Sequence, residues 1–127
     1  MLKQTHDYDE LLENLTADNI LSECRIAVLT SDKKKTSNNG IVYADCRIVK
    51  EDFAWICPYD FLITVYEPNV KSMSEEQMKI LFEHELMHCG VTYTPSGDIK
   101  CYIRPHDVQD FRVILEEHGV DWAIKNG

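Results

Sequence analysis

Residues 74–90 have the sequence SEEQMKILFEHELMHCG, and this stretch predicts the best-defined helix of the chain. Ser74 followed by Gln77, or Ser72 followed by Glu75, can form a capping box, in which two side chains satisfy backbone N–H groups at the helix start. Gly90 is the type of residue that commonly ends a helix, so we expect the helix to run through residue 89. Its apolar residues recur at helical spacing and predict a face packed into the core, made of Met78, Phe82, Leu86 and Cys89.

The same helix carries the HExxH pattern, His84-Glu85-Leu86-Met87-His88. Positions four apart on a helix differ by a net rotation of about 40°, so both imidazoles point to one side. Two neutral imidazoles on one face can hold a divalent metal, most often zinc. Glu85 lies beside the first histidine and can take a proton from a metal-bound water, whose pKa the metal lowers toward about 7. The pattern predicts a zinc centre with Glu85 as general base; a surface helix with incidental histidines and a non-catalytic metal site are the alternatives.

A catalytic zinc usually has three protein ligands and a water, so a third ligand must come from elsewhere in the chain. We expect His106, because it follows a predicted hairpin that lets the chain double back beside the helix. Asp107 either orients an imidazole or caps a last helix. His118, at the end of that helix, is the rival ligand, and Asp98 and Asp110 are the carboxylate alternatives.

Three residues near the motif have competing interpretations. Tyr93 and Tyr102 could hydrogen-bond a tetrahedral intermediate above the metal, but we favour an aromatic pair across the two hairpin strands. Cys89 directly follows His88, yet the next position on a helix points about 100° away. We therefore expect a buried core cysteine there and not a metal ligand.

The length of 127 residues fits a single domain, residues 1–127. The chain has 13 Lys and Arg against 22 Asp and Glu, a formal charge of −9 that repels phosphates, so we expect no nucleic-acid partner. No stretch approaches the ~20 apolar residues of a membrane span, and residues 1–7 lack the apolar run of a secretory signal. We expect a cytoplasmic protein without a membrane partner. The five cysteines form no CxxC pair, which predicts buried, reduced thiols and no cysteine zinc knuckle.

The predicted order of elements is helix, three strands, helix, hairpin, helix, which is an α+β domain with a three- to five-stranded sheet. The first helix spans residues 7–23, with a break near residues 14–19, and residues 31–40 form a loop. The last helix begins at Asp107 and ends at Gly119. The predicted strands, with the two of the hairpin, are residues 24–30, 41–49, 61–66, 91–94 and 99–103.

Four segments together resemble the family of putative phage metallopeptidases, small HExxH domains encoded by phages and prophages. These segments are Asp60–Ile63, Leu81–His88, His106–Phe111 and Gly119–Trp122. The resemblance covers about residues 44–122, and more loosely the strand that starts near Cys24. It implies a single zincin-like domain with zinc on His84, His88 and His106 and with Glu85 as the base. It also implies a phage or prophage origin, and therefore the cytoplasm of a bacterial host, but no particular substrate.

We expect a zinc-dependent hydrolase, and specifically a metallopeptidase that acts on a peptide or protein. In zincin-like folds the substrate can lie as an extra strand along a sheet edge, for which Phe61–Tyr66 and Ile41–Val49 are the two candidates. The alternative is a non-catalytic, metal-containing acidic protein that binds a host protein. Metal-dependent cleavage of nucleic acid is a third class, which the charge of −9 disfavours. The sequence leaves the oligomeric state open.

Overall fold

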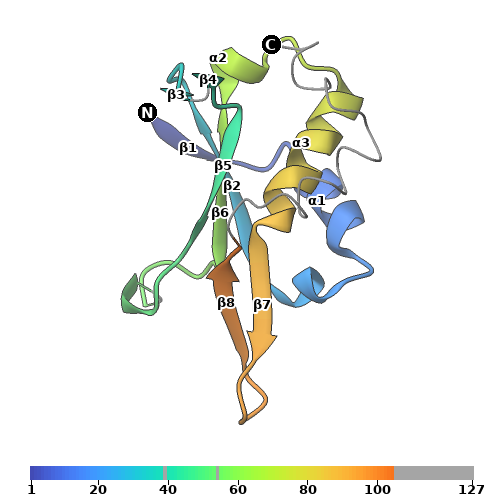
Figure 1. Ribbon diagram of the computed structural model, residues 1–127, viewed down its shortest axis with the longest axis vertical. Coiled ribbons are helices and arrows are strands. Elements are labelled where there is room, and N and C mark those ends of the chain that lie inside the picture. Colours follow the sequence, from blue (N-terminus) through green and yellow to red (C-terminus); the bar gives the residue numbers. More distant parts are fainter. Residues whose placement is uncertain (39, 54, 105–127) are drawn as a thin grey trace.

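The computed structural model describes residues 1–38, 40–53 and 55–104 of the chain, and it shows a small α+β fold (Figure 1). Its main feature is a mixed sheet of four strands in the order β1-β2-β6-β5. The central pair β2–β6 is parallel, whereas β1 and β5 pair antiparallel at the two edges. The four strands are β1 (Leu2–Thr5), β2 (Ile26–Ser31), β5 (Ala44–Ile48) and β6 (Phe61–Tyr66).

Strand β6 has the bounds that the sequence predicts, and it is the most deeply buried element. Phe61, Ile63 and Val65 are fully buried, and the intervening Thr64 is also buried, as expected for a strand with a neighbour on each side. Because β6 is central, its backbone has no open edge. The expectation that Phe61–Tyr66 offers an edge to a substrate strand is therefore wrong, and β5 is the edge strand of this pair.

The predicted first helix is broken, as the sequence indicates, into α1 (Asp9–Thr16) and a 3-10 turn (Ile20–Glu23). The turn is capped by Asn19, whose side chain accepts a hydrogen bond from the backbone N–H of Leu21 at 2.8 Å. Helix α1 packs beside α3 on one side of the sheet (Figure 1). Their contact includes the rings of Tyr8 and Phe82, with centroids 4.9 Å apart.

Helix α3 (Glu75–Met87) begins as predicted and ends two residues early. Ser74 and Gln77 form the capping box in both directions, so this pair caps the helix. The helix stops at His88 because Cys89 already belongs to β7 (Cys89–Tyr93), which pairs with β8 (Ile99–Ile103). The predicted face of Met78, Phe82, Leu86 and Cys89 is buried in the core.

Gly90 is a strand residue and not a helix terminator. It pairs with Tyr102 across the hairpin, and a Cβ at position 90 would lie 2.4 Å from that ring. The glycine is therefore needed because the tyrosine ring covers it. The hairpin has the predicted second strand and turn, but its first strand is Cys89–Tyr93 and not the predicted residues 91–94.

Several short elements were not predicted. Strand β1 lies in the segment expected to precede the first helix, and α2 (Glu67–Val70) follows β6 directly. The small pair β3 (Thr36–Ser37) and β4 (Gly40–Ile41) takes up part of the expected loop, so the strand expected over residues 41–49 shortens to β5. The last predicted helix, residues 107–119, lies outside the described residues. Among the described helices, none is long and apolar enough to cross a membrane.

Candidate functional site

The two histidines of the HExxH pattern lie side by side at the end of α3. His84 is in the last turn of the helix, His88 is its C-cap residue, and both are half-buried. Their ring centroids are 5.2 Å apart, with the planes at 75°. The helix therefore brings the two imidazoles together as the four-residue spacing predicts.

His88 is held in one tautomer by the backbone of Arg104. Its Nδ1 lies 2.7 Å from the carbonyl oxygen of Arg104, and because a carbonyl can only accept, Nδ1 carries the proton. In the neutral ring Nε2 is then the nitrogen with the lone pair, which is the form that a metal ligand requires. The N–H of Arg104 donates in turn to the carbonyl of His88 at 2.7 Å, so the end of the hairpin is tied to this histidine twice.

Glu85 follows His84 in the sequence, and its side chain is buried, with 5% of its surface exposed. Burial raises the pKa of its carboxyl to about 8, and the negative charge of Asp45 on β5 adds to the increase. A carboxyl of this kind can both accept and release a proton near neutral pH. Burial and a raised pKa are typical of a carboxyl that acts as an acid or base, and not of a surface glutamate.

Asp45 is the centre of a polar cluster that the sequence analysis missed. Its Oδ2 accepts hydrogen bonds from Tyr66 Oη at 2.6 Å and from Lys35 Nζ at 2.8 Å. The other oxygen, Oδ1, is buried and accepts no hydrogen bond from the described part of the chain; Nε of Arg47 lies 3.9 Å from it. The site thus holds a second carboxylate close enough to Glu85 to affect its pKa. Lys35, Asp45 and Tyr66 are 19 or more positions from Glu85 in the sequence, so no spacing rule could have linked them.

The hairpin tyrosines do not form the predicted pair. Tyr93 is opposite Ile99 and Tyr102 is opposite Gly90, so the register separates the two rings. Tyr93 Oη donates instead to a carboxylate oxygen of Glu23 at 2.8 Å. The expected aromatic pair is therefore wrong.

The remaining ligand candidates are either distant in the fold or not described. Asp98 belongs to the hairpin turn, where it bonds Thr94 and Ser96, at the end opposite to α3 (Figure 1). The other residues named from the sequence lie outside the described residues: His106, Asp107, Asp110 and His118.

Cys89 has the predicted structural role. It is buried in the core, its Sγ is 3.4 Å from that of Cys46, and this contact together with burial raises the pKa of its thiol. The thiol is enclosed in the hydrophobic core, where it has a packing role. All five cysteines are reduced, as expected; apart from Cys89, the others are half-buried, so the prediction that they are buried is only partly met.

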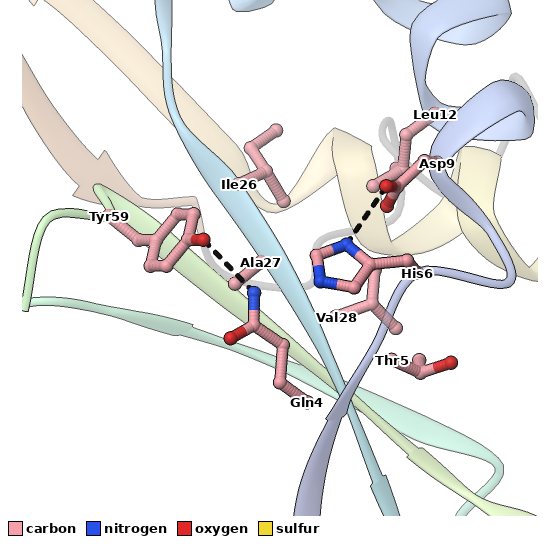
Figure 2. Close-up of a pocket in the computed structure, with 9 residues that line it drawn as sticks. All are labelled: Gln4, Thr5, His6, Asp9, Leu12, Ile26, Ala27, Val28 and Tyr59. Atoms are coloured by element: carbon pink, nitrogen blue, oxygen red, sulfur yellow. Dashed lines mark hydrogen bonds and ion pairs between the residues drawn. The ribbon is translucent and has the colours of Figure 1, made fainter.

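The pocket drawn in Figure 2 lies apart from the histidine pair, between β1, β2 and the start of α1. Its polar residues bond each other: His6 Nδ1 to Asp9 Oδ2 at 3.0 Å, and Gln4 Nε2 to Tyr59 Oη at 3.0 Å. No residue of the HExxH pattern lines this pocket. It is therefore not part of the candidate site.

Comparison with known proteins gives one match. Residues 2–125 match the family model described as "Putative phage metallopeptidase". The match covers nearly the whole chain, including the segments before Cys24 that the resemblance from sequence did not reach. No curated protein and no solved structure matches the chain.

Proposed function

The chain belongs to the putative phage metallopeptidase family, and we propose that it is a zinc-dependent peptidase with His84, His88 and His106 as metal ligands and Glu85 as general base. The observation that carries the proposal is the paired imidazoles at the end of α3, one of them fixed in its metal-binding tautomer by Arg104. A peptidase of this family would act on a peptide or protein, and that substrate class is part of the proposal. We also propose the cytoplasm of a phage-carrying bacterium as its location.

The residues of the site fit a divalent cation. Two imidazoles with centroids 5.2 Å apart offer nitrogen ligands of the kind that zinc prefers. The carboxylate of Asp45 acts electrostatically on Glu85, and a bound cation would favour the charged form of Glu85. When bound, the metal would supply a Lewis acid that polarises the substrate carbonyl and acidifies water.

His106 is the proposed third ligand because of where the described chain ends. Arg104 is fixed beside His88 by two hydrogen bonds of 2.7 Å. His106 follows Arg104 by two positions in the sequence. We propose His106 in preference to Asp98 or His118 because it is the histidine closest in sequence to this anchor point.

Glu85 would do the proton chemistry. As the carboxylate it takes a proton from the attacking water while the water oxygen bonds the carbonyl carbon of the scissile peptide. As the acid it gives that proton to the departing amine nitrogen, and the C–N bond breaks. Its burial keeps bulk water from competing for the proton, because 5% of its surface is exposed.

The substrate would add to the sheet at β5. This strand pairs only with β6 among the described strands, and it packs against both α3 and β8. An extended peptide can pair with the open backbone groups of such an edge. Because Asp45 lies on β5 and acts on Glu85 electrostatically, a peptide at this edge would lie near the general base.

The test is metal content together with hydrolysis, on the untagged full chain. We expect His84→Ala, His88→Ala and His106→Ala each to lose about one zinc per chain, whereas His6→Ala, at an exposed histidine before α1, keeps the wild-type content. Glu85→Gln should retain zinc and lose peptide hydrolysis by at least about 10²–10⁴-fold.

Casein and a peptide library are the substrates, with single-stranded RNA as the counter-substrate. A zinc content equal to that of the wild type in all three ligand variants would refute the site. Zinc bound by the histidines without cleavage of any peptide would refute the peptidase and favour a metal-containing binding protein.

A further inference from the structure

A second cluster of metal-ligating side chains lies outside the HExxH site. Cys24, Asp60 and Cys101 each offer one ligand atom, and these three atoms all lie within 4.8 Å of one another. The residues come from three distant parts of the chain: the end of the 3-10 turn before β2, the residue before β6, and the middle of β8. None of them belongs to the HExxH pattern or to its proposed third ligand.

The fold explains why these residues meet. Strands β2 and β6 are parallel with Ile26 opposite Phe61, so the residues just before them, including Cys24 and Asp60, lie at the same end of the sheet. The β7–β8 hairpin extends from α3 past that end (Figure 1) and contributes Cys101. Two parallel strands and a hairpin thus converge on one point.

Asp60 is fixed in place by the backbone next to Cys24. Its Oδ2 accepts the N–H of Arg25 at 2.8 Å, and its own N–H donates to the carbonyl of Arg25 at 2.7 Å. The guanidinium of Arg25 lies 3.9 Å from Oδ1 and is mostly exposed. These contacts hold the carboxylate beside the two thiols. They leave lone pairs on its oxygens that can bind a cation.

We propose that Cys24, Asp60 and Cys101 form a second metal site that takes zinc or a similar thiophilic divalent cation. In a tetrahedral site with Zn–S bonds of about 2.3 Å, ligand atoms are about 3.8 Å apart, so the cluster needs side-chain shifts of about 1 Å. A water completes the four ligands. Thiolate ligands select zinc over magnesium and calcium, which prefer oxygen.

Cation binding would change the charge of this cluster. Burial, together with the neighbouring Cys101 and the carboxylates of Asp60 and Glu23, raises the pKa of the Cys24 thiol to about 12. Without a cation both thiols keep their protons; binding of M²⁺ releases two protons and leaves two thiolates and a carboxylate around it. The resulting net charge of about −1 is opposed by Arg25. The site would join the hairpin to the sheet as a structural clamp.

The experiment uses cobalt as a probe on the reduced, metal-free full chain of the His84→Ala/His88→Ala variant. We expect a thiolate-to-cobalt charge-transfer band that saturates at about one equivalent and disappears when zinc is added. Cys24→Ser/Cys101→Ser in the same background should abolish the band. Cys57→Ser is the matched control, because Cys57 is also half-buried and lies outside the cluster, and it should leave the band unchanged.

Asp60→Asn is the second variant, because it keeps the shape of the side chain. We expect it to weaken cobalt binding by at least about 10–100-fold. Absence of the band in the reduced protein, or an equal loss in Cys57→Ser, would overturn the proposal. So would a disulfide between Cys24 and Cys101 in protein kept under reducing conditions.

The two proposed sites can fail separately. Wild-type protein should hold about two zinc ions per chain, and either the double histidine variant or the double cysteine variant should hold about one. Loss of zinc only with the histidines refutes the cysteine site alone. Loss only with the cysteines refutes the HExxH site alone.

Discussion

Replacing Glu85 by glutamine should stabilise the metal-free protein, and the gain should grow with pH. The carboxyl of Glu85 is 5% exposed. Burial, and then repulsion from Asp45, raises its pKa from 4.5 to about 8 in the folded chain. In the unfolded chain neither cause is present, so the pKa returns to its ordinary value. The folded protein therefore holds a proton that the unfolded chain has lost at neutral pH.

The sign of the effect follows from proton linkage. A carboxyl with the higher pKa in the folded state contributes its full stability below pH 4.5, and this contribution is lost as the pH rises toward 8. Within that window the folded state binds one proton more than the unfolded state, so the free energy of unfolding falls by about 1.4 kcal/mol per pH unit. Between pH 4.5 and pH 7 the loss is about 3 kcal/mol. Glutamine does not ionise and avoids this loss.

The assay is urea unfolding of wild type and Glu85→Gln in the presence of a chelator, from about pH 5 to pH 8. The stability difference between the two proteins should rise with a slope of about 1.4 kcal/mol per pH unit in favour of the variant. Glu13→Gln makes the same chemical change at an exposed position of α1 and is the control. Parallel stability curves for wild type and Glu85→Gln would refute the reasoning, and so would the same slope in the Glu13→Gln control.

Three further substitutions test the structure around the site, each by urea unfolding at neutral pH. Ser74→Ala removes the capping box of α3 and should cost about 1 kcal/mol, whereas an unchanged midpoint would show that the cap is dispensable. Phe82→Ala empties a fully buried position and should cost about 3–5 kcal/mol; a loss below 1 kcal/mol would contradict its place in the core. Tyr66→Phe removes the 2.6 Å hydrogen bond to the Asp45 carboxylate and should cost about 1.5–3 kcal/mol, an expectation that a neutral result would exclude.

The parts of the fold that sequence predicts well are those with local signals. Strand β6 is an apolar run that Glu67-Pro68 ends, and α3 begins at a capping box; both have the predicted start. The predicted end of α3 is wrong because a tertiary interaction determines where the helix stops. Cys89 pairs with Ile103 and therefore belongs to the hairpin. Gly90, which suggested a helix end, is required because the ring of Tyr102 leaves no room for a Cβ there.

The missed elements and residues have no local signal at all. Strand β1 has one apolar residue, Leu2, and its extended form comes from its pairing with β2. The sequence predicts the histidine pair because both residues lie on one helix. It cannot predict the approach of Asp45 to Glu85, because that depends on how β5 packs against α3. Cys24 and Cys101 are 77 positions apart, so a search for CxxC spacing cannot find them.

The two proposed metal sites are linked by the hairpin. Cys101 is three residues before Arg104, which is bonded to His88, and His106 follows two residues later. A cation held by Cys24, Asp60 and Cys101 would fix the strand that delivers Arg104 to the HExxH helix.

Ordering that strand in advance removes part of the entropy cost of assembling the histidine site, so the two cations should bind cooperatively. Zinc affinity of the histidine site, measured by competition with a chelator, should therefore be about 5–100-fold lower in Cys24→Ser/Cys101→Ser than in Cys57→Ser. Equal affinities in these two variants would show that the hairpin is already rigid without the second cation. In that case the two hydrogen bonds between His88 and Arg104 are sufficient to keep the end of the hairpin beside α3.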